Sequence, residues 1–268
     1  MTVQHKLVGN AMQLVMCQLE QGQTVYAEAG KFLWKTTNVS METRLSKPST
    51  GAGGGGDGGS GGGGLLGKVM DVGKRVLAGQ SLAFQYFTPT GGSGILALSG
   101  ALPGEMRAIE LDGSVGWYTE KDALIAAEST VDFDIAFAGL RTGRRGGTGF
   151  ILEHFTGMGT LFVAASGNFV ELNPAKYGGK IQVHTGAVVG FQDTVRYSVE
   201  HIGGLNAQTA MTAMFGGEGL NLATFEGDGT VILQSVNLHG LAGAIEKLMG
   251  DAGESKERGL GGLLDRVT

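Results

Sequence analysis

The hexapeptide FTGMGT, Phe155–Thr160, returns further along the chain as FEGDGT, Phe225–Thr230. Each copy leads directly into an apolar run, LFVAAS after the first and VILQS after the second. A glycine-rich loop of this kind cradles a phosphate when a helix begins at its glycines, and it joins two strands when a strand follows. Because a strand-like run follows both copies, we interpret them as hairpin turns. The glycines are expected to take positive φ angles, and the final threonine to begin the return strand.

The sequence around the two hexapeptides is repeated as well. GGTGFILEHFTGMGTLFVAASG matches GGEGLNLATFEGDGTVILQS along its whole length. An earlier segment, GQSLAFQYFTPTGGSGILALSG, is a third copy and places Phe87 at the position of Phe155 and Phe225. The phenylalanines recur about every 70 residues, and copies at a fixed period predict a repeat architecture in which neighbouring copies complete a common core.

The amino-acid composition and the pattern of apolar residues predict β-strands. The 268 residues include 50 glycines but only 4 prolines, which suits many tight turns and disfavours helices. We therefore expect an all-β fold of three tandem repeats with pseudo-threefold symmetry, a Gly-rich insertion with a short helix, and a C-terminal helix. The expected boundaries are one β domain over 1–245, repeats at 1–112, 113–178 and 179–245, the insertion at 51–78, and a helical, partly flexible tail at 246–268.

Charge and cysteine content exclude several classes of protein. The formal net charge of -5 argues against a protein that coats nucleic acid. The single cysteine, Cys17, excludes an intrachain disulfide framework and a cysteine-based zinc site. No apolar run approaches the roughly 18 to 20 residues that a spanning helix needs, and the start MTVQHKLVGN lacks the pattern of a signal peptide. A cytoplasmic location is therefore expected.

The insertion carries a pattern that resembles a nucleotide-binding loop. Residues 62–68, GGGLLGK, satisfy GxxxxGK, but Val69 stands where a P-loop needs a hydroxyl group for magnesium. A glycine tract also replaces the buried strand that should precede such a loop. A chance match is therefore favoured.

The same insertion has apolar residues at near-helical spacing beside three cations. One interpretation is a helix that packs over an open end of the protein's own β core, which Gly67 and Gly73 favour because they weaken the helix. The other is a basic amphipathic helix for a membrane surface or a partner. The residues that would form this surface are Leu65, Leu66, Lys68, Val69, Val72, Lys74, Arg75 and Val76.

No group of residues has the spacing of a catalytic or metal site. Arg141, Arg144 and Arg145 form the one local basic cluster, which is either an anion contact or a solvated turn. His154 and His184 fall on different expected strands, so a shared site would have to assemble between repeats. We predict no catalytic residue, no cofactor and no metal.

Two further blocks, GLLGKVMDVGKRVLAGQSLAFQYFTPTGGSGILAL and ALPGEMRAIEL, resemble the bacterial relatives of altered inheritance of mitochondria protein 24. The resemblance covers nearly all of residues 1–245. It implies a fold similar to the tryptophan RNA-binding attenuation protein, in which short antiparallel strands form a β-sandwich or double-stranded β-helix, here three times in one chain. It implies no enzymatic activity, and the RNA- and tryptophan-binding residues have no match in this sequence.

These observations predict a non-catalytic scaffold or binding protein that acts through an assembly or membrane-proximal surface. The expected partners are further copies of the chain or another protein, with peripheral membrane contact and no nucleic acid. The alternative is a small-molecule-binding protein or enzyme with a site at the junction of repeats. RNA binding by analogy of fold ranks third.

Overall fold

The structure, a computed structural model, describes residues 2–44, 83–138, 151–201 and 221–237, together with Leu241 and Ile245. Within these residues the chain forms eighteen β-strands and three short 3-10 helices, η1 (Lys121–Ala123), η2 (Pro174–Tyr177) and η3 (Thr185–Ala187). The prediction of a predominantly β protein is confirmed.

Phe87, Phe155 and Phe225 are fully buried, and each lies in the middle of three antiparallel strands, which we call a Phe triplet. The triplets are β6 (Phe84–Pro89) between β3 (Val25–Glu28) and β5 (Val39–Arg44), β12 (Ile151–Ala164) between β9 (Trp117–Glu120) and β11 (Val131–Ala138), and β17 (Asn221–Glu226) between β14 (Lys180–His184) and β16 (Arg196–His201).

The strand that follows each of these phenylalanines is the middle one of a second group of three strands. We call this group a Gly triplet because its middle strand begins at or just after Gly94, Gly159 or Gly229. The Gly triplets are β7 (Gly94–Ser99) between β2 (Leu14–Leu19) and β4 (Phe32–Lys35), the second half of β12 between β8 (Met106–Asp112) and β10 (Leu124–Glu128), and β18 (Val231–Gln234) between β13 (Phe169–Leu172) and β15 (Val188–Gln192). The strand β1 (Gln4–Val8) extends the first of them by pairing with β2.

The prediction that FTGMGT and FEGDGT are hairpin turns is wrong. Phe155–Thr160 lies inside the single strand β12, whose first half pairs with β9 and β11 and whose second half pairs with β8 and β10. Likewise, β17 and β18 flank FEGDGT but pair with different strands. The stretch carries the chain from one sheet to the next, as bent strands do at the corners of sandwiches.

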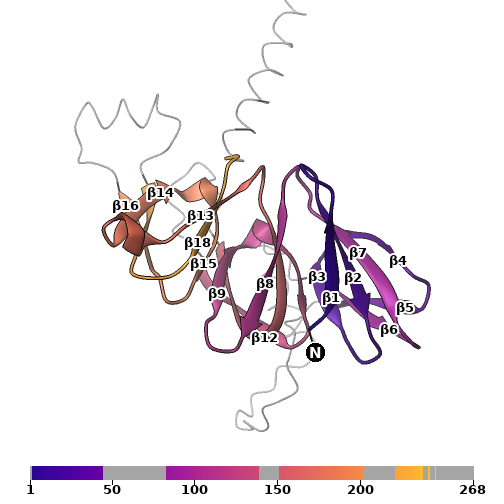
Figure 1. The fold of residues 1–268 in the computed structure, drawn as a ribbon. Helices are drawn as coiled ribbons and strands as arrows, with labels where there is room; N and C mark the ends of the chain where they lie inside the picture. Colours follow the sequence, from indigo (N-terminus) through magenta and orange to yellow (C-terminus); the bar gives the residue numbers. More distant parts are fainter. Residues whose placement is uncertain are drawn as a thin grey trace, which may run out of the picture.

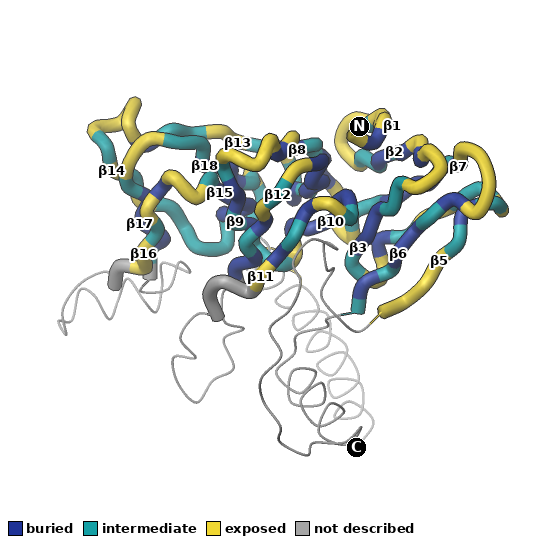
Figure 2. Tube along the Cα trace, turned by 90° about the horizontal axis from the view of Figure 1, so that it is seen from below, coloured by how far each residue is buried: buried dark blue, intermediate teal, exposed yellow. Residues whose placement is uncertain are grey.

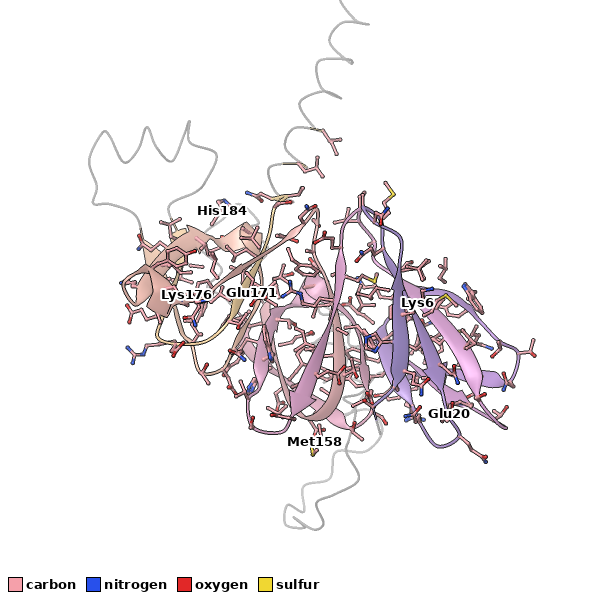
Figure 3. The ribbon with its side chains drawn as sticks, in the orientation of Figure 1. Lys6, Glu20, Met158, Glu171, Lys176 and His184 are labelled. Carbon is pink, nitrogen blue, oxygen red and sulfur yellow. The ribbon has the colours of Figure 1, made fainter. Side chains whose placement is uncertain are left out.

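The positive φ angles predicted for the hexapeptides are present. They are 100° at Gly157 and 147° at Gly159, and 112° at Gly227 and 154° at Gly229. No helix begins at these glycines, so neither stretch can present a helix N-terminus to a phosphate. Met158 projects from the bend into solvent and is 66% exposed (Figure 3).

Neighbouring triplets are joined edge to edge. The strand β3 of the first Phe triplet pairs with β10, and β9 of the second pairs with β15, both in antiparallel orientation. Figures 1 and 2 show the result from two sides: an elongated row of strands with β14 and β16 at one end and β5 at the other.

Buried residues gather in three clusters along this row. The cluster around Phe87 includes Ile125 of β10, and the cluster around Phe155 includes Val189 of β15. The third cluster surrounds Phe225. The first two cores are therefore completed by a strand from the next Gly triplet.

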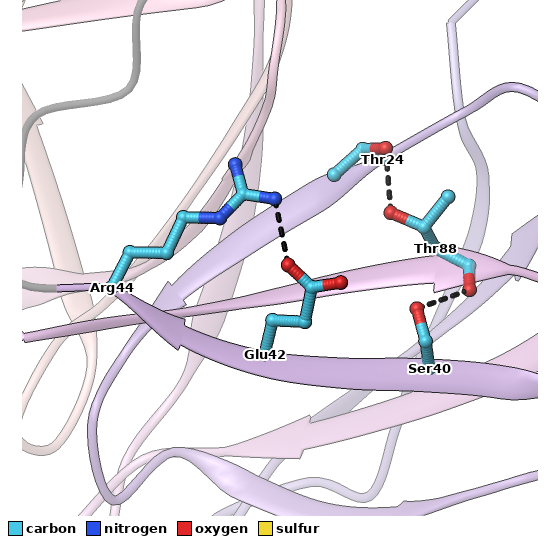
Figure 4. A network of polar contacts seen from close by, with 5 residues as sticks. All are labelled: Thr24, Ser40, Glu42, Arg44 and Thr88. Atoms are coloured by element: carbon cyan, nitrogen blue, oxygen red, sulfur yellow. Dashed lines mark hydrogen bonds and ion pairs between the residues drawn. The ribbon is translucent and has the colours of Figure 1, made fainter.

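A network of polar contacts joins strands of the first Phe triplet (Figure 4). The hydroxyl groups of Thr24 and Thr88 lie 2.8 Å apart, and Ser40 Oγ donates to the carbonyl oxygen of Thr88 at 2.9 Å. Arg44 pairs with Glu42 at 2.8 Å and lies over the ring of Tyr86. These contacts link β5 and β6 to the residue just before β3.

Among the described residues, no helix is both long enough and apolar enough to span a membrane. The Gly-rich insertion and the tail at 246–268 lie outside the described residues, so the helices expected there stay predictions. The proposed domain boundaries likewise stay predictions.

Candidate functional site

The surface residues predicted from the sequence cannot be placed. Both the apolar and basic positions at 65–76 and the arginines Arg141, Arg144 and Arg145 lie outside the described residues. The membrane or partner surface and the anion contact remain predictions.

The two histidines considered for a shared site have separate local partners. His154 Nε2 lies 3.2 Å from Asp193 Oδ2, and its ring stacks on Tyr118 with centroids 4.3 Å apart. His184 Nδ1 accepts a hydrogen bond from the backbone N–H of Gly186. In the described part of the chain, no group of three or more His, Cys, Asp or Glu side chains could hold a metal ion.

A side-chain oxygen anchors the start of the second and third Gly triplets. Glu128 Oε1 accepts hydrogen bonds from the Thr160 backbone N–H at 3.0 Å, from the Thr160 hydroxyl at 2.8 Å and from the Val3 N–H at 2.9 Å. Gln192 Oε1 accepts from the Thr230 N–H in the same way at 2.7 Å. Sequence reasoning noticed both threonines but missed the acceptors opposite them.

A second acidic group lies beside the β3–β10 joint. Glu153 is only 6% exposed, and its Oε2 has no hydrogen-bond partner. Burial, with the negative charges of Glu28 and Glu120 adding to it, raises the pKa of Glu153 to about 8. Burial also raises the pKa of Glu120 to about 7, with a further contribution from Asp122. Both carboxyl groups therefore keep their protons to a higher pH in the folded protein than in the unfolded chain.

A cavity of about 160 Å³ lies next to Glu120. Its polar lining comes from Lys31, Glu120, Asp122, Ser166 and Gln234. The volume is below the roughly 300 Å³ at which pockets for drug-sized ligands begin, so only a very small ligand fits. Glu153 itself does not line the cavity.

The most unusual feature of the surface is that two strands, β4 and β14, each have one edge without a partner strand in the described chain. In the described chain, β4 pairs only with β7 and β14 pairs only with β17. The strands at the position of β4 in the other Gly triplets are β10 and β15, and each has a strand on both sides. The strands at the position of β14 in the other Phe triplets are β3 and β9, and each of these also has a strand on both sides. Unpaired edges present backbone donors and acceptors to any strand that approaches, and proteins usually protect them.

The edge of β4 is also apolar. Leu33 is 48% exposed and Trp34 is 41% exposed, whereas Ile125 and Val189 at the position of Leu33 are 0% and 1% exposed. Sequence reasoning missed this edge. The signal was the stretch KFLWK, where Phe32, Leu33 and Trp34 follow one another, so apolar side chains occupy both faces of one short strand.

Comparison with known proteins identifies the family. The sequence model described as "Mitochondrial biogenesis AIM24" matches residues 5–236. The chain therefore belongs to the AIM24 family, and the resemblance noted from the sequence is confirmed.

Two bacterial proteins are similar over almost the whole chain. An uncharacterised protein of Streptococcus pyogenes serotype M6 is 27% identical over 237 residues, which cover 88% of this chain and 86% of the relative. The crystal structure of protein SPYM3_0169 from Streptococcus pyogenes superposes with a TM-score of 0.70 at 24% identity, covering 92% of this chain and 99% of that one. The second comparison supports the fold and no activity.

Proposed function

We propose that this protein is a non-catalytic scaffold that acts through an assembly surface made by the edges of β4 and β14. One observation carries the proposal: these two edges have no partner strand in the part of the chain that the structure describes, while every corresponding edge inside the molecule is paired. An open edge flanked by exposed apolar side chains is a ready place for another chain to add.

The proposal includes three equivalent units in one chain, each made of a Phe triplet and a Gly triplet. The support is the pairing of Val25 with Phe87, of Trp117 with Phe155 and of Ile181 with Phe225 at the same place in each Phe triplet. The Gly triplets agree too, since β4, β10 and β15 each carry an irregularity at the same point of their pairing.

The test is photo-crosslinking in the native host. A photoreactive amino acid replaces Leu33 in one variant and Met12 in another, because Met12 is an exposed apolar residue, at 73%, on the turn between β1 and β2. A scaffold should give a discrete cross-linked product from position 33 and not from position 12. Equal labelling at both positions, or none at either, would remove the proposal.

A second function is supported by the acidic cavity. Glu120, whose pKa is raised to about 7, lines a small, partly open cavity together with Lys31 and Asp122, as groups do in sites for small polar ligands. A thermal-shift screen with small amines, carboxylates and divalent cations tests it. A shift from one ligand class that disappears in Glu120→Gln supports this function, and no shift from any class contradicts it.

The amphipathic positions of the insertion give a further, independent proposal of peripheral membrane contact. Flotation with anionic liposomes, comparing the full chain with a variant lacking residues 51–78, tests it. Equal failure of both proteins to float would exclude it.

A further inference from the structure

The two joints inside the molecule follow one register. At the β3–β10 joint, Ala27 lies opposite Ala126, and Val25 lies opposite Glu128. At the β9–β15 joint, Thr119 lies opposite Gly190, and Trp117 lies opposite Gln192. A matching backbone hydrogen bond extends each joint, from Ser129 N–H to Thr24 O at 2.9 Å and from Asp193 N–H to Gly116 O at 3.0 Å.

The strands β4 and β14 hold the equivalent positions of a third joint. Trp34 of β4 is equivalent to Ala126 of β10 and to Gly190 of β15. Each of these three residues is the first paired residue after the register shift in its own strand. Val183 stands where β3 has Ala27 and β9 has Thr119, two residues after the partner of the buried phenylalanine.

We propose that β4 of one molecule pairs antiparallel with β14 of a second copy, in the register of the internal joints. Trp34 then lies opposite Val183 of the second copy, Lys35 opposite Gln182 and Thr36 opposite Ile181. The proposal rests on the assembly function above and names its partner as the same chain.

The hydrophobic cores explain why a copy of this chain fits. Ile125 of β10 enters the core around Phe87, and Val189 of β15 enters the core around Phe155. Among the described residues, the core around Phe225 has no such residue, and Ile181 and Val183 at its open side are only partly buried. Leu33 is the residue equivalent to Ile125 and Val189, and it is exposed at the far end of the row. In the described chain, the end of the molecule at β14 therefore lacks a core side chain, and the end at β4 exposes Leu33, the residue that holds the equivalent position.

The contact has to form between molecules. The two edges lie at opposite ends of the row of strands (Figure 1), with the second unit between them. Each copy carries one edge of each kind, so the contact is head-to-tail and uses two different surfaces. Such a contact closes into a ring when the rotation between copies allows it and otherwise builds a filament.

Mixed cysteine variants test both the partner and the register. In the proposed register, Trp34 and Val183 form a non-hydrogen-bonded antiparallel pair. The Cα atoms of such a pair lie about 4.5 Å apart, which is within the range that a disulfide spans. Trp34→Cys and Val183→Cys are purified separately, mixed and oxidised mildly. The only natural cysteine, Cys17, is fully buried and does not interfere. We expect a disulfide-linked dimer in the mixture and in neither variant alone.

Lys35→Cys mixed with Val183→Cys is the matched control, because neighbouring side chains of a strand point to opposite faces. It should give a large loss of cross-linking relative to the Trp34→Cys mixture. A Trp34→Cys dimer formed without the second variant indicates a symmetric contact and overturns the proposal. Equal cross-linking of both mixtures overturns the register.

Light scattering of the unmodified full chain keeps the proposal testable if a variant misfolds. We expect a mass at least double the 27.6 kDa of one chain. A monomer at all concentrations, as when the insertion or tail covers the edges, overturns self-association. A discrete photo-crosslinked product of another composition at position 33 would then still support the scaffold function, so the two failures are distinguishable.

Discussion

Gly159 marks a close approach of the chain at the bend in β12. A Cβ atom at this position would lie 2.8 Å from Thr130 Oγ1, 3.1 Å from Val131 Cγ2 and 3.2 Å from Glu128 Cβ, and the φ angle of 147° is strained for other residues. The Cβ of a residue at Gly229 would meet the side chains of the equivalent Thr194 and Val195. The glycines are therefore required by packing as well as by backbone conformation.

We predict that Gly159→Ala lowers the free energy of unfolding by about 3 kcal/mol, because strain and overpacking add at this site. Gly91→Ala is the control, since no atom lies within 4 Å of its added Cβ and its φ is not positive. Its effect should stay within about 0.5 kcal/mol. Urea denaturation measures both, and equal stability of the two variants would contradict this account of the bend.

Glu128 ties three donors to one carboxylate oxygen at the base of the second Gly triplet. Glu128→Ala leaves two buried backbone N–H groups without an acceptor and should cost about 3 kcal/mol. Glu128→Gln keeps the oxygen, as Gln192 does at the third unit, and should cost about 1 kcal/mol or less. Chemical denaturation of the three proteins gives the comparison, and an equal loss for both variants would show that the charge matters more than the acceptor.

Glu153 should make the stability of the protein depend on pH. Its pKa rises from the model-compound value of 4.5 to about 8 on folding, so the folded protein binds the proton more tightly than the unfolded chain. This contribution is complete below pH 4.5 and is lost as the pH rises through 8. Glu153→Gln, which imitates the neutral acid, should flatten this decline by on the order of 3 kcal/mol. Melting temperatures across this range, with exposed Glu20→Gln as control, test it.

At the scale of the strand, the backbone conformation of the glycines was easier to infer from the sequence than the strands that pair with one another. The positive φ angles of the glycines were predicted correctly from the repeated hexapeptide. The hairpin was wrong because a bend that passes from one sheet to another and a turn within one sheet need the same glycines. Only the partners of β12 distinguish them, and these are four earlier strands rather than two arms of a hairpin at the hexapeptide.

The edge of β4 can be blocked without disturbing its internal pairing. Thr36 N–H donates inward to Ile95 O at 2.9 Å, so by alternation the N–H of Lys35 points to the open side. Lys35→Pro should reduce the mass in light scattering to that of one chain. At dilutions where both variants are single chains, its melting temperature should stay close to that of Lys35→Ala. Lys35→Ala keeps the N–H and should remain associated. Unchanged association of the proline variant would contradict pairing through this edge.

At the scale of the whole molecule, the family and the β class could be predicted because they depend on local patterns and on similarity along the chain. The carboxylates and the open edges could not. Glu120 and Glu153 lie on two strands that pair with each other, and the exposure of Leu33 has meaning only beside the burial of Ile125 and Val189. Each depends on which distant strands pair, and a single sequence does not encode that in its periodicity.

Hydrogen–deuterium exchange of the full chain tests the central claim most directly. If β4 and β14 pair across copies, then the amides of residues 32–37 and 180–184 exchange slowly in concentrated protein, as those of β10 and β15 do. They become fast on dilution or in Lys35→Pro. Fast exchange of both segments at every concentration, or slow exchange that the variant leaves unchanged, would contradict the account.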